Sequence, residues 1–399
     1  GRKLNGGNRI ERRRGAADMI DGKRLKVVIA MDSFKGSLSS IEAGAAAREG
    51  ILRACNAEVV VKPLADGGEG TTEALVEGLG GSYAYVDVAG PLGVYTEAKY
   101  GIMKDGISAI MEMAEASGLM LIKPEELNPR KATTYGVGQM ILDAIKKGCR
   151  KFIIGIGGSA TTDGGVGMLQ ALGYEFFDKD GNPISYGIEE LDKIDKISAE
   201  RRLPELDECQ FEIACDVKNP LCGENGAVYV FGPQKGVKEE EKRIFDKKMQ
   251  HYAAVTSKYL GKDYSREEGA GAAGGLGFAF LSYLPNVQMK RGIDIVLNAI
   301  ELEKEVSEAD IVITGEGRLD FQTAMGKVPI GVAKLAKKYG KRVIAFAGSV
   351  TAEAVQCNNE GIDAFFPILR DVVTLNEAME KEIAKRNMTL TVEQVFRLI

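Results

Sequence analysis

The sequence predicts an α/β protein, in which both chain ends build a parallel, Rossmann-like three-layer domain and a second α/β domain is inserted between them. Residues 25–31 (LKVVIAM) form a continuous apolar run, which is typical of a strand buried on both faces of a parallel sheet. Strand and helix patterns alternate at both ends, whereas the middle mixes strands, loops and glycine-rich runs. We therefore expect one domain at residues 23–81 plus 290–399, another at 82–289, and an active site in the cleft between them.

The N-terminal part contains two strand, loop and helix patterns in succession. After the first strand, DSFKGSLSS leads to a helix expected from about Ile41, and Ser39 with Glu42 fits a capping box at its start. Residues 58–79 (EVVVKPLADGGEGTTEALVEGL) repeat the pattern with a glycine-rich loop. In such sheets, ligands bind at the loops that follow the carboxyl ends of the strands.

The C-terminal third has the same alternation. Residues 309–327 predict a strand and a long loop, 328–340 a helix, and RVIAFAGS and IDAFFPIL two strands. Thr374 with Glu377, and Thr391 with Gln394, predict capping boxes for two final helices. In the middle, SYAYVDV and GAVYVFG alternate in the manner of strands, and EGAGAAGGLGFAF is rich in glycine.

Composition excludes several classes of protein. The chain has 399 residues, 45% of them hydrophobic, which is enough for a large core and suggests two domains. Its 52 basic and 57 acidic residues are too balanced for a nucleic-acid footprint, so nucleic acid is not an expected partner. Six cysteines without a C-x-x-C pair and a single histidine, His251, do not provide the usual zinc ligands.

We expect a cytoplasmic protein without a membrane partner. No apolar run reaches the roughly 18 to 20 residues that span a bilayer, and the cysteines are interpreted as buried thiols in a reducing compartment. Residues 1–22 are polar and basic and are interpreted as a disordered or non-native arm outside the fold. Contact of this arm with phosphate stays open.

The stretch from Lys151 to Gly167, KFIIGIGGSATTDGGVG, is the strongest candidate for a ligand-binding loop. Glycine lets the backbone approach an anion, exposed N–H groups and hydroxyls bind phosphate oxygens, and a carboxylate can hold Mg²⁺. Two alternatives stay open. The stretch also matches the dinucleotide fingerprint G-x-G-x-x-A, with acidic residues about twenty positions on, or it is a turn without a ligand. The fingerprint residues would be Gly155, Gly157, Ala160, Glu175 and Asp178.

Carboxylates recur where apolar runs end. The residues are Asp32, Asp66, Asp216 and Glu316, and the central loop adds Asp163. Each acid taken alone is more often a helix cap or a turn former. Together they are expected to converge at one edge, where they would repel each other unless Mg²⁺ and lysines lie among them.

Three lysines, Lys35, Lys235 and Lys327, lie beside glycines in predicted loops, where an ammonium group can reach a phosphate. The alternative for each is a solvated loop lysine. The signatures of P-loops and protein kinases are absent. Phosphoryl transfer needs in-line positioning, charge neutralisation and a carboxylate that accepts a proton, so histidine is dispensable. His251 is interpreted as a surface or packing residue.

Eight motifs occur in order along the chain: DSFKGSLS, PLADGGEGT, TTYGVGQMI, GIGGSATTDGGVGML, CDVKNPLCGENGA, FGPQKG, GAGAAGGLGF and TGEGRLDFQTAMGKVP. Together they closely resemble the bacterial class II glycerate kinase family, from about Lys26 to the last residue. The resemblance implies a two-domain α/β enzyme that phosphorylates D-glycerate with ATP and Mg²⁺, mostly giving 2-phosphoglycerate. One departure is Met31, where the family often has proline.

Residue roles are predicted from the residues and the resemblance together. Catalytic candidates are Lys35, Asp66, Asp163, Asp216 and Lys235, with Asp216 or Asp66 as the general base. Binding candidates are Asp32, Ser33, Gly67, Glu69, Gly157, Gly158, Ser159, Thr161, Asn219, Gln234, Arg318 and Lys327. Metal candidates are Asp163, Glu316 and Asp320.

Several functional alternatives stay open. Arg318 or Lys235 would bind the glycerate carboxylate, although Arg318 could instead only pair with Asp320. Other possible activities are formation of 3-phosphoglycerate and phosphorylation of another small hydroxy acid. A noncatalytic nucleotide or phosphate sensor and a dehydrogenase are the remaining classes. Partners are expected to be small molecules, and homodimerisation is left open.

Overall fold

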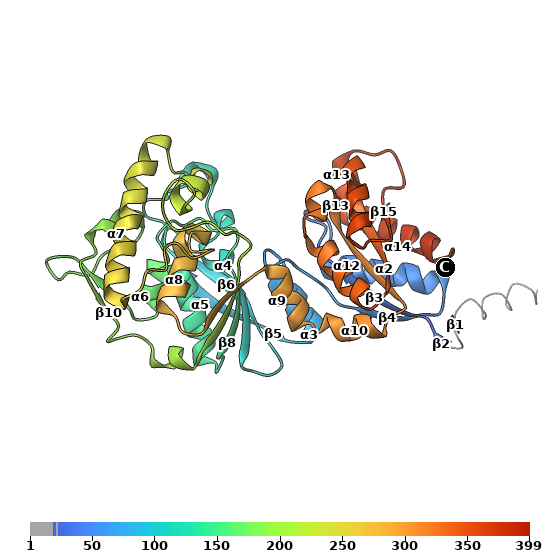
Figure 1. Cartoon of the computed structure of the whole chain (residues 1–399), viewed down its shortest axis with the longest axis horizontal. Helices are drawn as coiled ribbons and strands as arrows, with labels where there is room; N and C mark the ends of the chain where they lie inside the picture. Colours follow the sequence, from blue (N-terminus) through green and yellow to red (C-terminus); the bar gives the residue numbers. More distant parts are fainter. Residues whose placement is uncertain (1–18, 21–22) are drawn as a thin grey trace, which may run out of the picture. The chain divides into compact units, whose positions relative to one another are not determined.

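The computed structural model describes residues 19–20 and 23–399, which divide into two compact units (Figure 1). The terminal unit contains the chain up to Asp66, then Glu73–Gly78 and Val296–Ile399. The central unit contains Gly67–Thr72 and Leu79–Ile295.

The predicted N-terminal arm lies almost wholly outside the described residues. Of its 22 positions, only Met19–Ile20 are described, as the short strand β1, which pairs antiparallel with β2 (Lys23–Arg24).

The terminal unit is built on a five-stranded sheet in which every neighbouring pair is parallel, with the order β15-β14-β13-β3-β4. Numbered along the chain, this is the doubly wound order 2-1-3-4-5, whose switch point lies between β3 and β13. The strands are β3 (Lys26–Met31), β4 (Glu58–Val61), β13 (Ile311–Leu319), β14 (Arg342–Val350) and β15 (Ala364–Pro367).

Helices flank this sheet. Alternate residues of β3 and β13, such as Val27, Ile29 and Ile313, share one buried cluster with α2 and α14. The hydroxyl of Thr389 also bonds the carbonyl of Ala46, joining these two helices. The helices with residues in this unit are α2 (Ser40–Ala54), α3 (Thr71–Leu79), α9 (Gly292–Ala299), α10 (Leu302–Glu308), α11 (Phe321–Ala324), α12 (Val328–Lys338), η9 (Ala352–Glu360), α13 (Leu375–Met379) and α14 (Lys381–Phe396).

Two of the three capping predictions are confirmed. Ser39 with Glu42 caps α2, and Thr374 with Glu377 caps α13. The prediction at Thr391 is wrong, because α14 runs without interruption from Lys381 to Phe396. Its buried apolar residues, which include Val392, continue past this position, so packing on α2 overrides the local capping pattern.

The central unit contains a six-stranded sheet with the order β12-β11-β8-β7-β6-β5. The strands from β12 to β7 are parallel, and β6 and β5 extend the sheet antiparallel. The strands are β5 (Ser82–Ala89), β6 (Tyr95–Ile102), β7 (Ser108–Glu112), β8 (Lys151–Gly155), β11 (Gln210–Ala214) and β12 (Val287–Lys290), while β9 (Glu175–Phe177) and β10 (Lys196–Ser198) form a separate ribbon.

Helices and short helical turns complete the central unit. They are α4 (Ala114–Ser117), η1 (Leu119–Leu121), η2 (Pro124–Glu126), α5 (Tyr135–Lys146), α6 (Val166–Ala171), η3 (Ile188–Lys193), η4 (Pro204–Glu208), η5 (Ala227–Phe231), η6 (Pro233–Lys235), η7 (Glu239–Glu241), α7 (Lys242–Leu260), η8 (Ala272–Gly275) and α8 (Leu276–Tyr283). SYAYVDV is a strand as expected, but GAVYVFG is the π-helical turn η5. A short apolar run cannot by its alternation alone distinguish a strand from a helical turn.

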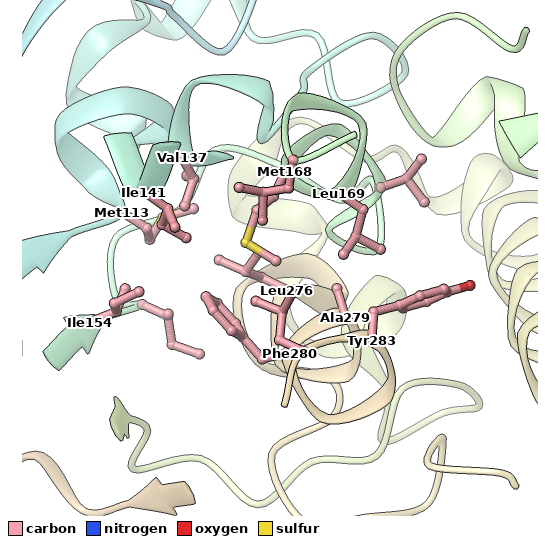
Figure 2. Close-up of a cluster of buried hydrophobic side chains, with 14 of the residues drawn as sticks. Met113, Val137, Ile141, Ile154, Met168, Leu169, Leu276, Ala279, Phe280 and Tyr283 are labelled. Atoms are coloured by element: carbon pink, nitrogen blue, oxygen red, sulfur yellow. The ribbon is translucent and has the colours of Figure 1, made fainter. Parts of the chain in front are cut away.

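The core of the central unit holds both ends of the glycine-rich loop. Figure 2 shows Val137 from α5 and Met168 from α6 in one buried cluster with Phe280 from α8. Ile154 of β8, just before the loop, belongs to the same cluster. Since β8 and α6 are both anchored here, the loop between them, residues 156–165, starts and ends on rigid elements.

Candidate functional site

The switch point of the terminal sheet carries two buried acids. Asp32 directly follows β3 and is 7% exposed, and Glu316 lies inside β13 and is 8% exposed. The backbone N–H of Asp32 donates to the carbonyl of Gly315 at 3.0 Å, which fixes the end of β3 beside Glu316. The sequence placed Glu316 at a strand end, but β13 continues to Leu319.

The electrostatics of this switch point favour cations. The pKa of Asp32 is raised to about 7, mainly by burial and in addition by the negative charges of Asp66 and Glu316, while Lys35 opposes the rise. Burial also raises the pKa of Glu316, against the opposing effects of the Thr323 hydroxyl, Lys327 and Lys35. Both lysine side chains are exposed. An excess of buried carboxylate next to exposed ammonium groups suits a ligand that brings phosphate and a cation.

The segment after β13 forms a short helix where the sequence predicted a long loop. Asp320 caps α11, accepting a hydrogen bond from the N–H of Thr323 at 3.1 Å. The Nε of Arg318 lies 3.6 Å from the Asp320 carboxylate, so the expected pairing alternative for Arg318 is present. The hydroxyl of Thr323 donates a second hydrogen bond, to the Glu316 carboxylate at 2.5 Å.

In the central unit, Asp163 organises the glycine-rich loop from within. Its carboxylate accepts hydrogen bonds from the N–H and hydroxyl of Thr134, at 2.8 and 2.9 Å, and from the N–H groups of Gly165 and Gly167, at 3.0 and 3.1 Å. Asp163 is 1% exposed. Burial raises its pKa, and these donors oppose the rise. These hydrogen bonds give Asp163 a structural role in the loop. A role of Asp163 in catalysis or metal binding remains a prediction.

Lys235 contacts the same loop from η6. Its Nζ donates to the Ser159 hydroxyl at 2.8 Å and to the Thr161 carbonyl at 2.7 Å. The side chain is 2% exposed. Burial lowers the pKa of Lys235 to about 7, with the charge of Asp163 opposing the shift.

The remaining candidates of the central unit lie mostly on exposed segments. Asp216 is exposed and accepts a hydrogen bond from the N–H of Gly292 at 3.1 Å. Asn219 is half-buried and donates to the Asn225 carbonyl at 2.8 Å. The other exposed candidates are Gly157, Gly158, Gln234 and Glu69.

Gly67, which belongs to the central unit, packs on the carboxyl edge of the central sheet. A Cβ added at Gly67 would lie 2.7 Å from the Cβ of Ala214, and one added at Gly155 would lie 2.3 Å from the Gly67 carbonyl oxygen. Only glycine permits this approach, and Gly67 also has φ +91°.

The structure therefore brings the candidates together in two groups. Asp32, Ser33, Lys35, Asp66, Glu316 and Lys327 gather in the terminal unit, and Ser159, Thr161, Asp163 and Lys235 gather in the central unit. Convergence of all five acids stays a prediction. Within residues 19–20 and 23–399, no three or more acidic, histidine or cysteine side chains are arranged as a metal-binding group. The metal roles of Asp163, Glu316 and Asp320 stay predictions.

Sequence reasoning gave no role to Thr134 or Glu112. Thr134 lies in the quoted motif TTYGVGQMI, directly before α5, and this motif was the available signal. Glu112 accepts a hydrogen bond from the N–H of Thr72 at 3.3 Å, and burial raises its pKa. No sequence signal identified this contact, because it joins segments that are distant along the chain.

The dinucleotide alternative for the glycine-rich loop does not fit the structure. In that fingerprint, the helix begins within the glycine motif, whereas α6 begins only at Val166. His251 is half-buried, and its Nε2 lies 2.8 Å from the Ile194 carbonyl, a packing role as expected.

Residues 27–399 match the model of the glycerate kinase family. The chain belongs to this family. It is 46% identical to the glycerate kinase of Haemophilus influenzae over 94% of this chain and 99% of the relative. It is also 46% identical to the glycerate 2-kinase of Escherichia coli, over 89% of this chain and 93% of the relative.

A solved structure agrees with the family assignment. The crystal structure of a protein described as glycerate kinase 2, from Salmonella typhimurium LT2, matches with a TM-score of 0.87 and 44% identity. The match covers 94% of this chain and 98% of that chain. The α/β fold class and the resemblance to glycerate kinases are thus confirmed, and membership makes the protein a phosphotransferase.

Membership also implies ATP as the phosphate donor. In the described residues, no helix combines the length and apolarity that a membrane span requires.

Proposed function

We propose that this glycerate kinase family member transfers the γ-phosphoryl group of ATP to the 2-hydroxyl of D-glycerate, giving 2-phosphoglycerate and ADP. The observation that carries the proposal is the family match over residues 27–399. The position of the new phosphate rests on the name glycerate 2-kinase of the E. coli relative. A cytoplasmic location and a homodimer remain expectations.

The two groups of candidate residues suit the two requirements of phosphoryl transfer, which are positioning and charge neutralisation. The glycine-rich loop offers Gly157 and Gly158, exposed next to the buried Ser159, as backbone donors for phosphate oxygens. Lys35 and Lys327 offer exposed ammonium groups beside the switch-point acids. We propose that both groups serve the same reaction.

Two acids remain candidates for accepting the proton of the attacking hydroxyl. Asp216 is exposed, and one of its carboxylate oxygens is occupied by the N–H of Gly292. Asp66 is half-buried and lies near enough to Asp32 for its charge to raise the pKa of Asp32. For the glycerate carboxylate, the exposed Arg318 is the better candidate, because Lys235 is buried and already bonded.

We propose Mg²⁺ as a partner of the nucleotide phosphates rather than as a metal held by a protein cage. Mg²⁺ commonly takes one or two carboxylates together with substrate phosphates, so a missing three-acid group in the described residues is compatible with it. Glu316 is the favoured protein ligand, whereas Asp163 is saturated by its donors. Bound Mg²⁺ would neutralise charge on the transferred group.

Steady-state release of ADP tests the proposal. The protein with ATP and Mg²⁺ is expected to release ADP only when D-glycerate is added, with L-glycerate and lactate as controls for enantiomer and for other hydroxy acids. Turnover with another hydroxy acid but not with glycerate would favour the alternative kinase. Tight binding of ATP, with no release of ADP in the presence of any tested acceptor, would favour a noncatalytic nucleotide sensor.

A further inference from the structure

Burial distinguishes Lys235 from the other lysines of the described chain. Its side chain is 2% exposed, and it is the one lysine among the buried polar residues of that part of the chain. Lys35 and Lys327, the other lysine candidates, are exposed. A buried amine is costly unless its donors are satisfied, so the partners of Lys235 indicate what it does.

Those partners both belong to the glycine-rich loop. The Ser159 hydroxyl and the Thr161 carbonyl accept from Nζ at 2.8 and 2.7 Å, and they lie on either side of Ala160. The lysine comes from η6, 76 residues later in the chain than Ser159. Both acceptors are uncharged, so these bonds hold the loop in place and do not form an ion pair.

The loop is fixed at its other end by Asp163, through the N–H groups of Gly165 and Gly167 and through Thr134. Between β8 and these two buried anchors lie Gly157 and Gly158, which are exposed. The left-handed φ of Gly158, +74°, shows that this segment has a conformation that glycine favours. The buried side chains of Lys235 and Asp163 therefore fix the backbone on which the exposed Gly157 and Gly158 lie.

We infer that Lys235 is a positioning residue that acts through Ser159 and Thr161, and that phosphate binding is left to the exposed Gly157 and Gly158 segment. The identity of the phosphate ligand rests on the proposed function. The positioning role does not, because the contacts are present without any ligand.

Amide hydrogen exchange of the ligand-free protein tests the positioning role directly. Lys235→Met removes the amine that donates both hydrogen bonds while keeping a similar side-chain length, and exchange of peptides covering residues 156–165 is expected to become at least tenfold faster. Lys238→Met, at an exposed position three residues away, is the matched control and should leave this exchange unchanged. Unchanged exchange in Lys235→Met would overturn the inference. If Lys235→Met does not fold, Ser159→Ala removes one of the two acceptors, and it should accelerate exchange by a smaller factor.

Kinetics separate this role from a direct chemical one. If Lys235 acts through the loop, Lys235→Met should raise the KM of one substrate about tenfold or more, while kcat changes less. The double variant with Ser159→Ala should then lose no more than Lys235→Met alone, because both changes act on one loop. A large loss of kcat at unchanged KM, with normal exchange, would instead assign Lys235 to the chemistry. Faster exchange in a protein without glycerate kinase activity would leave the positioning role intact and refute only the proposed function.

Discussion

The hydroxyl of Thr134 donates to Oδ2 of Asp163 at 2.9 Å and accepts from the N–H of Met168 at 3.0 Å. One side chain thereby connects the start of α5, the glycine-rich loop and α6. The Asp163 carboxylate thus depends on Thr134. The sequence shows the motif that contains Thr134, but it does not show that Thr134 contacts Asp163.

Thr134→Val should destabilise the protein by roughly 1 to 3 kcal/mol, because a buried carboxylate and a buried N–H each lose a partner. The free energy of unfolding in urea measures this. Thr162→Val is the matched control. Thr162 is equally buried in the same loop, and its hydroxyl has no hydrogen-bond partner, so its loss should cost little. Equal losses in the two variants would contradict the importance of the Asp163 contact.

Gly274→Ala should disturb the glycine-rich loop from outside. An added Cβ would lie 1.9 Å from the Thr161 carbonyl oxygen, at φ +65°. We expect a loss of roughly 3 kcal/mol or more in unfolding free energy, since backbone must move. Gly181→Ala has a similar φ of +79° but nothing within 4 Å, so thermal denaturation should show only the roughly 1 kcal/mol cost of the left-handed conformation.

Asp32→Asn should change how stability depends on pH. Burial raises the pKa of Asp32 from 3.8 to about 7, so between these values the folded protein binds more protons than the unfolded chain. The contribution of Asp32 to stability therefore falls as pH rises through this window. At pH 8 the variant should be more stable than the wild type by roughly 2 to 4 kcal/mol, and near pH 4 the two should converge. A pH-independent difference in melting temperature would argue against the raised pKa.

Lys35→Ala and Asp216→Asn should each lower kcat by about 100- to 1000-fold. Both side chains are exposed, so the melting temperature should hardly change. Wild-type turnover in either variant would remove that residue from the catalytic set. Asp163→Asn differs, because its four donors make the carboxylate part of the fold, and we expect lost stability together with lost activity.

The fold was largely predictable because its signals are local. The continuous apolar run at β3 and the capping pairs at Ser39 and Thr374 identify elements without knowledge of their neighbours. Where tertiary packing decides, the sequence failed. Thr391 has a capping pattern but lies within a helix buried against α2, and GAVYVFG alternates like a strand but forms the turn η5.

For the site, the sequence identified residue types better than their tasks. Lys235 and Asp163 were chosen because charged groups among glycines suit phosphate chemistry, yet both are buried and bonded within their own unit. Burial and partners depend on residues far away in sequence, such as Thr134 for Asp163. The family resemblance did not supply this information, since it assigns a reaction and not a hydrogen-bond partner.

The most direct test of the proposed function is phosphorus NMR of the product formed from ATP, Mg²⁺ and D-glycerate. We predict a single new phosphomonoester resonance, that of 2-phosphoglycerate, in amounts equal to the ADP formed. A resonance of 3-phosphoglycerate, or ATP that stays intact in the presence of D-glycerate, would contradict the account.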